Sequence, residues 1–200
     1  MDSENKPTKI SDLLFTAAKK WPEHPAISFR GRTQNWLETK NRCHAAATIL
    51  QRAGVKPGDR VAFLGLNSNA CFESYYSPAI LGATMVPINY RLAVREMVEC
   101  VQDCTPTVLI VDENYLTEAR QLQESCDSVK TLIACGDNAA SDGMLSYEQD
   151  VYEIIRNNAY CEISPSVDDE TVIIFYTGGT TGRSKGVMLS NNNFQCNTLC

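Results

Sequence analysis

Apolar residues recur along this chain at two different spacings, and each spacing predicts a kind of secondary structure. Between residues 10 and 21 they lie three and four apart, as on one face of an α-helix that Pro22 and Pro25 then end. The same spacing predicts helices over 37–53, 69–81, 94–101, 115–124 and 147–156. A small hairpin is predicted around Gly31, where two short extended segments flank a turn.

Short apolar runs between the helices predict strands that are buried on both faces. They cover residues 61–66, 84–89, 107–112, 129–135 and 171–177. Because strand and helix alternate, we expect an α/β fold with mainly parallel sheets covered by helices and built from right-handed βαβ units. Residues 136–143 and 157–170 are predicted to be exposed loops, since they are rich in polar residues and helix breakers.

Length and charge narrow the class of protein. At ~150 residues per domain, the chain of 200 residues is one large domain or a substantial part of something bigger. Its 18 Lys and Arg against 24 Asp and Glu give a net charge of −6, and the chain contains no dense basic stretch. Both observations argue against nucleic acid as a partner. The longest apolar runs are far shorter than the ~20 residues that span a bilayer. We therefore expect neither secretion nor a transmembrane segment.

Cysteine and histidine give no metal site. The nine cysteines are odd in number and form no CxxC pair, which favours a reduced, intracellular chain over a disulfide scaffold. Cys100 and Cys104 share a helix face, but zinc needs further ligands, and the only histidines are His24 and His44. We interpret these residues as packing or surface residues, and no metal ligand is assigned.

The candidate chemistry lies in the loop that follows the strand over 171–177. Three glycines there allow backbone N–H groups to approach a ligand, threonine and serine add hydroxyl donors, and Lys185 adds a positive charge. This combination suits a polyphosphate, whereas the alternative is an ordinary flexible surface turn. A Walker A loop is excluded, because Lys185 stands between Ser184 and Gly186 rather than between Gly and Ser or Thr.

The segment YTGGTTGRSKGVMLSNNN, residues 176–193, resembles the phosphate-binding signature of the AMP-forming acyl-CoA synthetases, the adenylate-forming ligase superfamily. Residues 41–68 and 80–92 are similar to segments that precede this signature in fatty-acyl and aryl acyl-CoA ligases. The resemblance implies a two-step reaction. A carboxylic acid attacks ATP, which carries Mg²⁺, to form an acyl adenylate and pyrophosphate, and coenzyme A then captures the acyl group.

The resemblance also assigns residues to ATP. Lys185 and Thr180 are the candidate catalytic residues, since they would stabilise charge on the departing phosphates. The full set assigned to the nucleotide is Thr177, Gly178, Gly179, Thr180, Thr181, Gly182, Arg183, Ser184 and Lys185. Three positions depart from the family pattern: Gly178 replaces Ser, Ser184 replaces Pro, and Asn191 stands where a His beside the acyl pocket is common.

Family members are more than twice as long, and their further nucleotide motifs follow the loop. We therefore expect residues 1–200 to be the N-terminal part of an AMP-dependent synthetase domain, apparently truncated, without the mobile C-terminal domain and inactive alone. The alternative is a non-catalytic nucleotide-binding or interaction module that keeps the fold. The cytoplasm is the expected location, or the peroxisome if the true C-terminus lies beyond Cys200.

Overall fold

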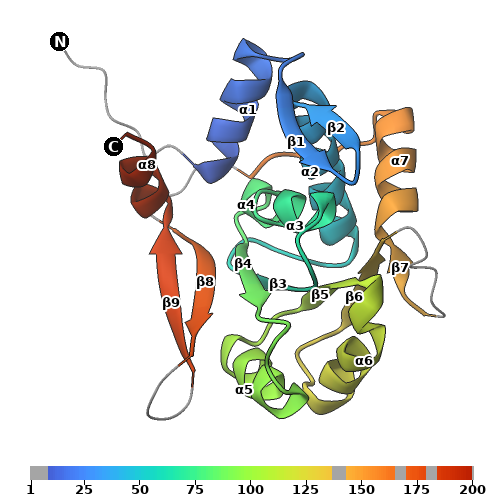
Figure 1. The fold of residues 1–200 in the computed structure, drawn as a ribbon, viewed down its shortest axis with the longest axis vertical. Helices are drawn as coiled ribbons and strands as arrows, with labels where there is room; N and C mark the ends of the chain where they lie inside the picture. The colour runs from blue at the N-terminus through green and yellow to red at the C-terminus, as the bar shows by residue number, and fades with distance from the viewer. Residues whose placement is uncertain (1–8, 137–142, 165–169, 179–183, 200) are drawn as a thin grey trace.

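A seven-stranded sheet forms the centre of the molecule (Figure 1). The computed structural model describes residues 9–136, 143–164, 170–178 and 184–199. Across the sheet the strand order is β7-β6-β5-β3-β4-β8-β9, and every neighbouring pair is parallel except β8 and β9. The strands are β3 (Arg60–Leu64), β4 (Thr84–Ile88), β5 (Val108–Asp112), β6 (Thr131–Cys135), β7 (Leu145–Ser146), β8 (Thr171–Thr177) and β9 (Lys185–Ser190). The predicted mainly parallel α/β fold is confirmed.

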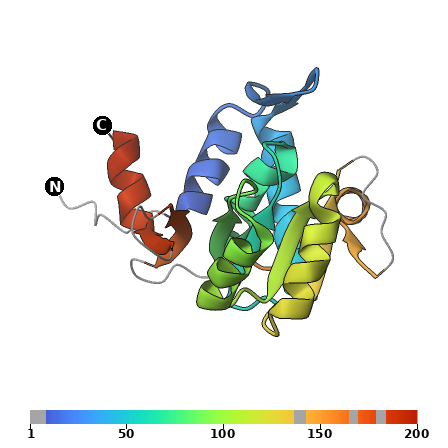
Figure 2. The ribbon, with the colours of Figure 1, turned by 60° about the horizontal axis from the view of Figure 1, so that its bottom comes forward.

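Helices cover both faces of this sheet. On one face lie α1 (Ile10–Lys20), α2 (Trp36–Arg52) and α7 (Tyr147–Asn157), and on the other lie α5 (Val94–Cys104) and α6 (Leu116–Ser125). In β3 the side chains alternate between them, since Val61 and Phe63 join the first core and Ala62 and Leu64 the second. Figure 2 shows α5 and α6 packed side by side on their face of the sheet. Burial on both faces explains why these strands read as continuous apolar runs.

The predicted hairpin is present, and the single helix predicted over 69–81 is wrong. Strands β1 (Pro25–Phe29) and β2 (Arg32–Asn35) pair antiparallel beside α2. The segment 69–81 forms two short helices, α3 (Asn69–Ser74) and α4 (Ser77–Ile80). Because Pro78 has no N–H to donate to the carbonyl of Ser74, a continuous helix cannot pass this point.

Strand β8 is less buried than its apolar sequence predicts. It pairs with β4 through Ile173 alone and with β9 along most of its length. Phe175 is 36% exposed, and Thr177 at the strand end is exposed as well. The expectation of a strand buried on both faces is therefore wrong for its carboxyl half, which lies beside the exposed edge strand β9.

One of the two predicted exposed loops packs onto the core in its described part. The backbone N–H of Cys161 donates to the Thr48 hydroxyl of α2 at 2.9 Å, and the His44 ring stacks on Tyr160. His44 also hydrogen-bonds through Nε2 to the carbonyl of Cys161 at 2.8 Å. Residues 160 and 161 are thus held against α2, whereas residues 157–159 and 162–163 are exposed as predicted. For the other loop, residues 137–142 lie outside the described part of the chain.

Candidate functional site

The glycine- and threonine-rich loop joins β8 to β9, and its two ends face each other. Thr177 is the register partner of Lys185, and the Thr177 hydroxyl donates to the Lys185 carbonyl at 3.4 Å. Of the nine residues assigned to the nucleotide, the structure places four: Thr177, Gly178, Ser184 and Lys185. The other five lie outside the described residues: Gly179, Thr180, Thr181, Gly182 and Arg183. Their assigned roles stay predictions.

The placed residues leave the base of the loop open to a ligand. Gly178 and Lys185 are exposed, and a Cβ built on Gly178 would meet no atom within 4 Å. Among the described residues no carboxylate forms an ion pair with Lys185. Its ammonium group therefore keeps its charge available for an anion, such as a phosphate.

Helix α5 contacts the strand that leads into the loop, from the face of the sheet that α1, α2 and α7 do not cover. The Tyr176 hydroxyl donates to the Asp103 carboxylate of this helix. Burial and the Asp103 hydrogen bond both raise the pKa of Tyr176, so its hydroxyl stays protonated and donating. Sequence analysis missed Asp103, because nothing local links it to a tyrosine 73 positions later.

Asn191 serves a different purpose from the pocket role that the family pattern implies. Its side chain is 2% exposed, and its Oδ1 accepts a hydrogen bond at 3.0 Å from the backbone N–H of Ile10. Its own N–H donates to the carbonyl of Glu170. In this chain the residue therefore fastens the first turn of α1 to the start of α8 (Asn191–Leu199).

The described residues form neither a cluster of metal ligands nor a membrane-spanning helix. No three His, Cys, Asp or Glu side chains of the described ranges gather as a metal site would require. Within those ranges no helix is both long and apolar enough to cross a bilayer. The eight described cysteines are free thiols, and most of them are buried.

A mainly parallel α/β sheet that ends in a hairpin, with hydroxyl, glycine and lysine groups at the base of its loop, is an arrangement typical of nucleotide-phosphate-binding domains. The particular family follows from comparison of the whole sequence. The family described as AMP-binding enzyme matches residues 14–200, and this chain belongs to it.

Individual relatives agree with this assignment. The chain is 31% identical over 192 residues to the indoleacetate–CoA ligase of Aromatoleum aromaticum, covering 96% of this chain and 36% of that protein. The crystal structure of the anthranilate CoA ligase AuaEII with anthranoyl-AMP matches all of the chain with a TM-score of 0.87 at 22% identity, over 38% of its own length. The N-terminal domain of FACL13 from Mycobacterium tuberculosis matches 92% of the chain with a TM-score of 0.76 at 26% identity, over 44% of its own chain. The chain thus spans about a third of the curated ligase and well under half of each structure.

Proposed function

We propose that this chain is the N-terminal part of an ATP-dependent carboxylic acid:CoA ligase that activates a fatty or aryl acid through an acyl adenylate. The observation that carries the proposal is the open loop base between β8 and β9, with exposed Thr177 and Lys185 opposite each other. Family membership over residues 14–200 and the aryl acids named in two of the relatives support it.

In this proposal the loop binds and orients the phosphates of ATP. The Lys185 ammonium stabilises the negative charge that builds up on pyrophosphate as it leaves, and Gly178 lets the backbone approach the anion. Thr180 donates from within the loop. Mg²⁺ would enter with ATP as the counter-ion of its phosphates.

The test is ATP binding and ATP–pyrophosphate exchange by the chain and by the longest product of its coding sequence, with variants at Lys185. A phosphate-binding role predicts that Lys185→Ala weakens ATP binding about tenfold or more, the equivalent of the ~1.5–3 kcal/mol of a charged hydrogen bond. Lys185→Arg should keep part of the binding, since the charge is retained. Lys130→Ala is the matched control, because Lys130 is also exposed but precedes β6, which is separated from β8 by three strands of the sheet.

The outcomes distinguish a ligase from a non-catalytic nucleotide-binding module. Exchange activity in the longer product that Lys185→Ala removes would support the ligase. ATP binding without exchange in every product would instead identify the non-catalytic nucleotide-binding module. Unchanged ATP binding in Lys185→Ala would refute the role of the loop in both.

A further inference from the structure

A polar cavity of about 410 Å³ lies away from the β8–β9 loop, beyond the carboxyl ends of β5 and β6. It is bounded by the β1–β2 hairpin and the start of α3, and no described residue of the loop lines it. The chain leaves β3 toward β4 on one side and leaves β5 toward β6 on the other. This divergence is the switch point at which open α/β sheets bind ligands, and 410 Å³ lies within the size range of small-molecule sites.

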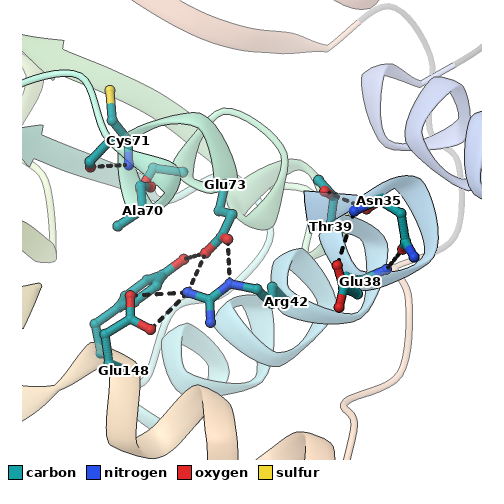
Figure 3. A network of polar contacts seen from close by, with 11 residues as sticks. Asn35, Glu38, Thr39, Arg42, Ala70, Cys71, Glu73 and Glu148 are labelled. Atoms are coloured by element: carbon teal, nitrogen blue, oxygen red, sulfur yellow. Dashed lines mark hydrogen bonds and ion pairs between the residues drawn. The ribbon is translucent and has the colours of Figure 1, made fainter. Parts of the chain in front are cut away.

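A buried arginine forms one wall of this cavity. Arg42 is 8% exposed, and its Nε and Nη2 donate to Glu73 and Glu148 (Figure 3). The Tyr147 hydroxyl donates to Glu73 at 2.7 Å, which holds that carboxylate in place. Nη1 of Arg42 hydrogen-bonds to none of the described residues (Figure 3). A fixed, charged donor is therefore available from this wall.

A buried carboxylate forms the facing wall. Asp112, at the end of β5, is 8% exposed, and its Oδ1 accepts from the backbone and side chain of Asn114. Its Oδ2 accepts from no described residue, although Asp112 lines the cavity. Since a carboxylate only accepts hydrogen bonds, Oδ2 can accept from a ligand donor such as a sugar hydroxyl.

Charged side chains of the hairpin and of the segment after β5 also line the cavity, which adjoins an apolar space. Arg30 and Arg32 of the hairpin line the polar cavity, and both are exposed. A second cavity of about 270 Å³ shares Phe29 and Ser68 with the first and is lined by the aromatic rings of Phe72 and Tyr75. The two adjoining cavities, together called the joined cavities, thus offer guanidinium groups, a carboxylate acceptor and an apolar recess.

We propose that the joined cavities bind a nucleoside monophosphate at a site separate from the β8–β9 loop. The phosphate contacts Arg30 and Arg32, where guanidinium groups favour bidentate binding. The ribose hydroxyls donate to Asp112, and the base occupies the recess beside Phe72 and Tyr75.

The experiment is titration of the 200-residue chain with adenosine monophosphate, adenosine and ribose 5-phosphate, followed by calorimetry. Arg32→Ala and Asp112→Asn should each weaken binding of adenosine monophosphate by about tenfold, while Phe72→Leu should weaken it without affecting ribose 5-phosphate. The matched control is Arg95→Ala, because this arginine of α5 is 91% exposed and lies on the other face of the sheet. Arg32 is exposed, so its variant tests the site without disturbing the core.

Lys185→Ala distinguishes this site from the loop. Nucleotide binding that survives Lys185→Ala but falls in Arg32→Ala supports the second site, whatever the fate of the proposed ligase function. Binding that falls in Lys185→Ala and is unchanged in Arg32→Ala and Asp112→Asn overturns the proposal, as does the absence of any binding by folded protein.

Discussion

Position 178 is glycine where the family pattern has serine, and the space that a serine side chain would begin to fill is empty. A serine Cβ there would meet no atom within 4 Å, and the backbone of Gly178 is not in the left-handed region. We therefore expect Gly178→Ser to change the free energy of unfolding by less than about 0.5 kcal/mol. The restored hydroxyl should tighten ATP binding, because it adds a donor at the loop base.

Chemical denaturation and ATP titration measure the two effects of Gly178→Ser. Gly178→Ala is the control, since it adds the carbon without the hydroxyl. Tighter binding in both variants would mean that the hydroxyl is not responsible.

His44 makes stability depend on pH. Burial between Phe15 and Tyr160 lowers the pKa of His44 from 6.5, although its bond to the Cys161 carbonyl opposes the shift. The unfolded chain therefore takes up a proton below pH 6.5 more readily than the folded chain does. Stability contributed by neutral His44 should be complete above this pH and decline as the pH falls toward the lowered folded value.

Unfolding free energies measured between about pH 7.5 and 5.5 test this expectation. His44→Gln should flatten the slope, whereas His24→Gln, at an exposed position, should leave it unchanged. An unaltered slope in His44→Gln would assign the dependence to another group.

At the scale of the element, the β8–β9 hairpin needs glycine at position 186. A Cβ there would lie 2.8 Å from Cγ2 of Ile174 and 3.4 Å from the Tyr176 ring on the neighbouring strand. Because Ile174 is branched at Cβ and cannot turn aside freely, Gly186→Ala should destabilise the protein by roughly 1–3 kcal/mol. Thermal unfolding measures this change, and Gly178→Ala in the same hairpin should cost far less; equal losses would contradict the steric cause.

Helices and strands were predictable where the local sequence alone determines them. Spacing of apolar residues located α2 and α5, and apolar runs located β3 and β5. The predictions fail where one particular residue or an adjacent strand determines the structure. Pro78 divides 69–81 because of one missing hydrogen-bond donor, and Phe175 of β8 is exposed beside the edge strand β9.

At the scale of the whole molecule, Asn191 joins the two ends of the fold. Asn191→Ala removes the acceptor of the buried Ile10 N–H, and an unsatisfied buried donor costs about 1–3 kcal/mol. We expect a loss of unfolding free energy of this size by chemical denaturation. The control is Asn197→Ala, an exposed asparagine of the same helix, which should be nearly neutral. Equal stability of the two variants would show that the link contributes nothing.

The candidate site was predictable only in its contiguous part. The loop was found because Thr177, Gly178 and Lys185 stand close together in a distinctive order. The polar cavity gave no sequence signal, because Arg32, Arg42 and Asp112 come from separate elements and meet only through the sheet topology. Asn191 was noted only as a departure from the family pattern, since its hydrogen-bond partner Ile10 lies 181 residues away.

The separation of 181 residues between Ile10 and Asn191 has a consequence during protein synthesis. Ribosomes add about 5–20 residues per second, so roughly 10–35 s pass between the incorporation of Ile10 and that of Asn191. Throughout this interval the nascent chain contains α1 without the side chain that receives its first amide hydrogen. Of the helices that the structure describes, α1 is therefore translated first but completed only after the start of α8 has been made.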